Sequence, residues 1–169
     1  MDQTLKSDQA FSKLNVAVVD DNAALRGAVR TVLTSFGCKQ VLEAENAHAA
    51  INLVKSGQID LIIVDWKMRP IDGLSLVKKL RDRDESPDPY IPIIMLTAYD
   101  DRAHRQEAHD AGVNGFLPKP FDAARLYEAM AEVINNPRYY VRTSDFFGPD
   151  RRFEDSRFIG PERRDAITA

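Results

Sequence analysis

The sequence predicts an α/β fold with a doubly wound parallel sheet of five strands. Between residues 14 and 135, short apolar runs alternate with segments of helical periodicity five times. The run Leu-Ile-Ile-Val at residues 61–64 is unbroken and ends at Asp65, which is typical of a strand buried on both faces. Because neighbouring parallel strands need crossover connections, the alternation places helices on both sides of the sheet.

Five apolar runs, each bounded by polar residues or turns, predict the strands. They are residues 14–19, 40–44, 61–64, 91–96 and 115–117. Good N-cap residues precede three of the predicted helices, at Asn22, Asn46 and Asp122. Another helix follows Gly73, and the fourth, residues 100–111, is polar and carries little apolar surface. Glycines end three helices, at Gly37, Gly57 and Gly112.

The composition fits one globular domain with an appendage: 169 residues, 44% hydrophobic and 29% charged. A net charge of −3 gives no overall attraction to nucleic acid or an anionic membrane, so neither is expected as a partner. The single cysteine, Cys38, excludes an intramolecular disulfide and a multi-cysteine zinc site. Residues 1–13 lack the apolar region of a signal peptide, and no apolar run is long enough to span a membrane. We therefore expect a cytoplasmic protein whose residues 1–13 are a loose leader.

Residues 136–169 break the strand–helix pattern. A unit of the form Phe-x-Gly-Pro-acid-Arg-Arg occurs twice, at residues 146–152 and 158–164. The density of aromatic residues argues against pure disorder, and we expect an extended C-terminal arm that docks on a partner or a sister subunit. Residues 139–141 favour a β conformation and could pair with an edge strand or a dimer mate. The alternative is a solvated extension without fixed structure.

Three carboxylates are expected at the carboxyl edge of the sheet, where ligands bind in open α/β folds. Asp20 and Asp21 follow the first strand, and Asp65 ends the third. If these strands are neighbours, the carboxylates converge and repel one another. A divalent cation would relieve that repulsion, and Mg²⁺ suits hard oxygen ligands best.

A hydroxyl and an ammonium group are expected at the same edge. Thr97 ends the fourth strand, and Lys119 follows the fifth. Either residue alone is more often structural or solvated than functional. Together with the carboxylates and Mg²⁺, they suit an incoming phosphoryl group, which one carboxylate can attack.

These motifs resemble the response-regulator receiver domains of two-component signalling, in particular the single-domain chemotaxis type. The resemblance covers roughly residues 14–135 and implies a flavodoxin-like sheet with strand order 2-1-3-4-5. The matching segments are Val-Val-Asp-Asp-Asn at 18–22, Ile-Ile-Val-Asp-Trp-Lys-Met at 62–68, Asp-Gly at 72–73, Met-Leu-Thr-Ala at 95–98 and Phe-Leu-Pro-Lys-Pro-Phe at 116–121.

The resemblance implies that Asp65 accepts a phosphoryl group from a histidine kinase or a phosphotransfer protein. Mg²⁺ would be bound by Asp21, Asp65 and the backbone carbonyl of Lys67, with Asp20 acting partly through water. Thr97 would contact the phosphoryl oxygens.

Lys119 would contact the same oxygens, and the resemblance implies that its bond to Pro120 is cis. Phosphorylation would draw Thr97 toward the new charge, and Phe116 would fill the vacated space. Phe116 could instead be an ordinary core residue.

Two further residues, Lys67 and Tyr99, occupy the positions that tune phosphate lifetime in the family, and both are large enough to slow the attack of water on phosphorus. Arg69 departs from the family pattern, because it displaces the proline that commonly follows Met68 by one position.

Trp66 is expected as a half-exposed wall beside Asp65. The three histidines, among them His104, show no metal-binding spacing and are expected to be solvated.

The leading prediction is a two-component response regulator that switches binding to a downstream protein and carries no DNA-binding output domain. It is not expected to be an enzyme beyond its own phosphorylation and dephosphorylation. A homodimer through the final helices or the arm is left open. The alternatives are a phosphate-independent adaptor and an aspartyl-nucleophile phosphatase, which needs a second acid where Trp66 and Lys67 stand.

Overall fold

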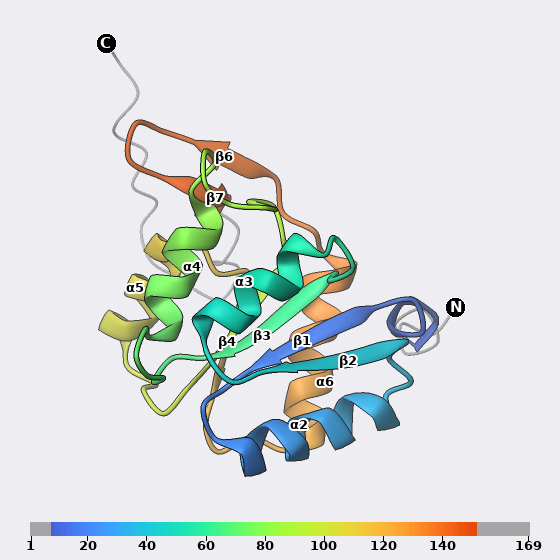
Figure 1. The fold of residues 1–169 in the computed structure, drawn as a ribbon. Helices are drawn as coiled ribbons and strands as arrows, with labels where there is room; N and C mark the ends of the chain where they lie inside the picture. The colour runs from blue at the N-terminus through green and yellow to red at the C-terminus, as the bar shows by residue number, and fades with distance from the viewer. Residues whose placement is uncertain (1–7, 152–169) are drawn as a thin grey trace.

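The computed structural model describes residues 8–151 and contains a five-stranded parallel sheet (Figure 1). The strand order is β2-β1-β3-β4-β5, as the sequence and its resemblance predicted. The strands are β1 (Asn15–Val19), β2 (Gln40–Ala44), β3 (Leu61–Asp65), β4 (Ile93–Thr97) and β5 (Gly115–Pro118). The helices are α2 (Ala23–Ser35), α3 (Ala47–Lys55), α4 (Gly73–Arg81), α5 (Arg102–Ala111) and α6 (Ala123–Asn135).

The helices cover the sheet in two layers, with α2 and α6 on one face and α3, α4 and α5 on the other (Figure 1). Strand residues alternate between the two faces, so each face has its own apolar core. Ile62 and Val64 of β3 belong to the core beneath α3 and α4, whereas Leu61 and Ile63 pack against α2 and α6. All of β3 is buried, which explains its unbroken apolar sequence.

Side-chain caps fix where the helices begin. The predicted caps Asn22, Asn46 and Asp122 each accept backbone N–H bonds from the first turn. The polar helix begins at Arg102 rather than at residue 100, because the carboxylate of Asp101 caps it by accepting the N–H of His104. Within residues 8–151, no helix is both long and apolar enough to cross a membrane.

The prediction of a loose leader is wrong for residues 8–13. Residues 8–11 form a helical turn, and the ring of Phe11 is completely buried. Phe11 packs against Phe36, which follows α2, and against Tyr127 of α6, with ring centroids 6.3 and 5.1 Å away. The Tyr127 hydroxyl donates a hydrogen bond to Asp8, 2.9 Å away. This segment therefore closes the core between the two helices.

The described part of the C-terminal arm is a hairpin rather than an extended segment. Strands β6 (Tyr140–Arg142) and β7 (Phe147–Pro149) pair with each other, so the β-prone stretch finds its partner within its own chain. The hairpin includes most of the first repeat unit. The second unit, residues 158–164, lies outside the described residues.

Arg81 anchors the hairpin to the domain. Its buried guanidinium donates to the carbonyl oxygens of Gly112, Pro89 and Ile91, and lies 5.3 Å from the centre of the Tyr140 ring. The Tyr140 hydroxyl donates to the carbonyl of Tyr90 over 2.7 Å. These contacts lie where β4 begins and α5 ends, at the edge of the sheet opposite the predicted carboxylates.

Replacing Phe11 with alanine should lower the free energy of unfolding by about 3 kcal/mol or more, because it removes a fully buried ring. Denaturant unfolding of the full chain measures this. The matched control is Lys13→Ala at an exposed neighbouring position, which should change the stability by less than about 0.5 kcal/mol. Equal stabilities of the two variants would show that residues 8–13 do not support the fold.

Candidate functional site

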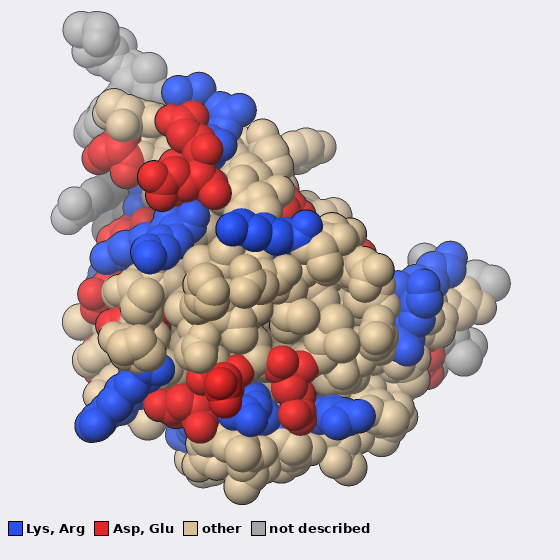
Figure 2. All heavy atoms as spheres, viewed as in Figure 1, with Lys and Arg blue, Asp and Glu red and all other residues tan. Residues whose placement is uncertain are grey.

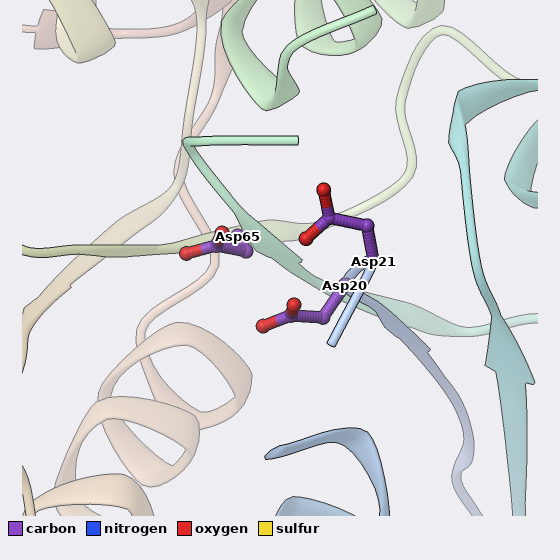
Figure 3. A group of neighbouring side chains, drawn as sticks. All are labelled: Asp20, Asp21 and Asp65. Carbon is purple, nitrogen blue, oxygen red and sulfur yellow. The ribbon is translucent and has the colours of Figure 1, made fainter. Parts of the chain in front are cut away.

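Three carboxylates meet where β1 and β3 end (Figure 3). One oxygen from each of Asp20, Asp21 and Asp65 lies within 4.8 Å of the other two. The pairing of β1 with β3 brings them together, because residues 19 and 64 lie side by side in the parallel register. Asp20 and Asp65 are buried, whereas Asp21 is exposed. The cluster is therefore open to solvent on the Asp21 side.

Lys119 and Thr97 flank the carboxylates, as the order of strands predicted. The Lys119 ammonium donates to Asp65 Oδ1 over 2.6 Å and lies 3.9 Å from Asp20 Oδ2. Its bond to Pro120 is cis. Thr97 is fully buried at the end of β4, and its hydroxyl oxygen accepts the backbone N–H of Tyr99 over 2.9 Å. The two side chains come from neighbouring strands on the Asp65 side of the cluster.

The electrostatics of the cluster favour a cation. Burial raises the pKa of Asp20, and the negative charge of Asp65 raises it further, while the N–H of Asn22 acts in the opposite direction. Asp20 Oδ2 is buried without a hydrogen-bond partner among the described residues. A hard divalent cation would satisfy this oxygen and offset the repulsion, so the donor set fits Mg²⁺.

Gly73 allows α4 to begin against the end of β3. A Cβ atom at this position would lie 2.1 Å from the backbone oxygen of Asp65. The Gly73 N–H donates to the Trp66 carbonyl over 2.7 Å, and Asp72 caps the helix. Any side chain at Gly73 would therefore displace the backbone that carries Asp65.

The loop after β3 contains a contact with the carboxylate cluster that sequence reasoning did not identify. The backbone N–H of Arg69 donates to Asp21 Oδ2 over 3.2 Å, so the residue inserted before the proline helps to hold the exposed carboxylate. The Arg69–Pro70 bond is also cis. Lys67 is exposed on the same loop. A backbone N–H contact carries no residue-type signal, so the sequence could not have revealed it.

Arg26 is a second residue that the sequence analysis missed. From the first turn of α2 it reaches back, and its Nη1 donates to the backbone oxygen of Asp20 over 2.7 Å. This bond fixes the turn in which Asp20 and Asp21 project toward the cluster. The sequence offered one signal for this contact, because Arg26 stands one helical turn after the Asn22 cap and can reach back to the end of β1.

Phe116 lies half-buried on β5 and packs against the core on the side of α3, α4 and α5. The guanidinium of Arg105 on α5 lies 5.5 Å from the centre of its ring and also pairs with Asp100. The Phe116 ring is thus partly exposed, and it contacts Arg105 of α5, the helix that follows Thr97 in the chain.

Trp66 and His104 depart from their predicted environments. Trp66 is buried, with 8% of its surface exposed, instead of forming a half-exposed wall. His104 is not simply solvated, because its ring stacks on that of Tyr99 and contacts the edge of Trp66. The three residues form one aromatic cluster between β3 and α5. Their separation in sequence explains why the cluster could not be predicted.

Comparisons with known proteins agree with the family resemblance found in the sequence. Residues 16–131 match the model of the response regulator receiver domain. Chemotaxis protein CheY-3 of Vibrio cholerae is 33% identical over 121 residues, which cover 72% of this chain and 92% of that protein. A chemotaxis protein CheY homologue of Campylobacter jejuni is 37% identical over 122 residues, with the same coverage. The crystallised CheY4 of Vibrio cholerae superposes with a TM-score of 0.65 at 29% identity, covering 71% of this chain and 98% of that one.

Replacing Asp20 with asparagine should stabilise the metal-free protein at pH 7 by on the order of 1 kcal/mol, because it removes one of three crowded charges. The folded state binds the Asp20 proton more tightly than the unfolded chain does, so ionisation of Asp20 destabilises the fold. The destabilisation by ionised Asp20 is absent below the pKa of Asp20 in the unfolded chain and complete above its raised pKa in the folded protein. The stability gained by Asp20→Asn should therefore shrink as the pH falls toward 3.8, the ordinary pKa of an aspartate.

Denaturant unfolding of both proteins in the presence of a chelator, at pH 7 and near pH 3.5, measures this difference. The control Asp84→Asn removes one exposed charge far from the cluster and should leave the stability nearly unchanged. An Asp20→Asn protein that is less stable than the wild type at pH 7 would contradict the electrostatic account.

Proposed function

Because the chain belongs to the response regulator receiver domain family, we propose that it accepts a phosphoryl group on Asp65 from the phosphohistidine of a histidine kinase or phosphotransfer protein. The observation that carries the proposal is the Asp65–Lys119 pair within the acidic cluster, 2.6 Å long and beside the buried Thr97. A nucleophilic carboxylate, a fixed cation and a hydroxyl donor at one edge are the groups that phosphoryl transfer requires.

Asp65 would act as the nucleophile. Lys119 occupies Oδ1, and Oδ2 accepts no hydrogen bond from residues 8–151. An oxygen of Asp65 attacks phosphorus, the new O–P bond forms as the P–N bond breaks, and the histidine leaves with the bonding electron pair. Lys119 then neutralises one phosphoryl oxygen, and the Thr97 hydroxyl donates to another.

Magnesium dependence follows from the charge of the cluster. Asp20, Asp21 and Asp65 would hold the ion together with the backbone carbonyl of Lys67. When bound, Mg²⁺ would neutralise the carboxylates and the phosphoryl oxygens, which otherwise repel one another. Arg26 and the Arg69 N–H would keep Asp20 and Asp21 oriented toward the ion.

The output of the domain would be a change in binding to another protein, in the cytoplasm, rather than a reaction on a separate substrate. Thr97 would move toward the phosphoryl group, and Phe116 and Arg105 would transmit the change to the surface of α5. On the face shown in Figure 2, basic and acidic side chains lie beside one another without a large area of either sign. This mixture favours a protein partner over nucleic acid.

Within the described residues, the first arm repeat packs against the end of α5. The Arg151 guanidinium lies 4.1 Å from the centre of the Phe146 ring and pairs with Asp110 at the end of α5. A Cβ on Gly148 would lie 3.1 Å from Gly112 Cα, so the glycine permits close approach. A homodimer through α6 or the arm stays part of the proposal.

Incubation with acetyl phosphate and Mg²⁺ should add one phosphoryl group to the wild type and none to Asp65→Asn, because Asp65 is the proposed nucleophile. Intact-mass spectrometry reads the product as a gain of about 80 Da for one phosphoryl group. Asp60→Asn, at an acid outside the cluster, should behave as the wild type does. Equal labelling of Asp65→Asn and the wild type would reject Asp65 as the acceptor.

The phosphoryl group should be hydrolysed slowly, because the resemblance assigns Lys67 and Tyr99 to positions whose long side chains would hinder water. Lys67→Ala should shorten the half-life several-fold, since it opens the exposed side of the site. The decay of the phosphorylated mass after removal of acetyl phosphate measures this. Half-lives of seconds in both the wild type and Lys67→Ala would contradict it.

A further inference from the structure

The aromatic cluster beside the candidate site is tightly organised. The rings of Tyr99 and His104 stack with their centroids 4.3 Å apart and their planes at 10°. The edge of Trp66 meets both rings, at 5.4 Å from His104 and 6.2 Å from Tyr99. Trp66 follows Asp65 directly, and Tyr99 lies two residues after Thr97. The cluster therefore joins the backbone segments that carry both functional side chains.

His104 is held at two points by Asp101. One carboxylate oxygen of Asp101 accepts the backbone N–H of His104 over 3.0 Å, and the other lies 2.5 Å from its ring nitrogen Nδ1. The first contact is also the N-cap of α5. The imidazole is thus fixed to the first turn of a helix, and it offers Tyr99 a rigid face on which to stack.

Tyr99 connects this fixed face to Thr97. Its backbone N–H donates to Thr97 Oγ1 over 2.9 Å, and Thr97 is completely buried. No hydrogen bond joins Thr97 to Asp65 within residues 8–151. If Oγ1 moves toward a phosphoryl group on Asp65, it must leave the Tyr99 N–H. The stack on His104 holds Tyr99 in place and so opposes that movement.

We propose that His104 is a positioning residue that holds the β4–α5 loop in its unphosphorylated arrangement. By fixing Tyr99, it lowers the affinity of the Asp65 site for a phosphoryl group. The inference rests on the proposed function, because it requires Asp65 to be the acceptor. Its energetic scale is that of one aromatic pair, which corresponds to roughly a 2- to 12-fold change in binding.

The test is the binding of beryllium trifluoride, a phosphoryl mimic, to the full chain in the presence of Mg²⁺. Fluorine NMR follows the bound mimic as its concentration rises. His104→Ala should lower the dissociation constant by roughly 2- to 12-fold, because Tyr99 is released. His104→Phe keeps an aromatic face and should return the constant toward the wild-type value. The control is Glu107→Ala, at an exposed position on the same helix, which should leave it unchanged.

A double-mutant cycle separates positioning from a general effect on α5. Tyr99→Ala should lower the dissociation constant as His104→Ala does, and the double variant should gain no more than either single one. Additive gains, or an unchanged constant in His104→Ala, would overturn the inference. Acetyl phosphate labelling of the same proteins identifies which claim fails. A wild type that gains no phosphoryl group rejects the proposed function and the inference with it, whereas a labelled wild type with an unaltered His104→Ala rejects the inference alone.

Discussion

The mutual repulsion of Asp20, Asp21 and Asp65 is the constraint on which the rest of the structure depends. Crowding three carboxylates, two of them buried, costs free energy that only the surrounding fold can offset. The burial of β3 and of the two apolar cores provides the stabilising free energy that offsets this cost. Lys119 compensates part of the charge. The repulsion that Lys119 does not compensate would favour the binding of a divalent cation in the proposed function.

The elements around the cluster differ in how firmly they are held. β3 and β4 are buried throughout, whereas α5 buries only Ala108 and Ala111 among its ten residues. Such a helix loses little apolar contact when it shifts, which suits it to transmit a change at Thr97. Its first turn carries His104 and Arg105, and its last turn is held by the arm through Asp110. The two ends of α5 therefore face the site and the hairpin respectively.

Sequence reasoning was strongest where a local rule determines the structure. Apolar runs located the five strands, caps such as Asn22 located the helices, and strand ends brought Asp20, Asp65 and Lys119 to one edge. It failed where distant segments decide the outcome. Burial of Phe11 depends on an opening between α2 and α6, and the hairpin depends on Arg81, 59 residues before Tyr140. No periodicity records such contacts.

A crystal structure of the full chain grown with Mg²⁺ and beryllium trifluoride would test the central claim most directly. The account predicts a trifluoride on the Asp65 carboxylate, contacted by Lys119 and Thr97, and a metal ion that touches Asp21 and Asp65. An unmodified Asp65, or an ion bound away from all three carboxylates, would contradict it.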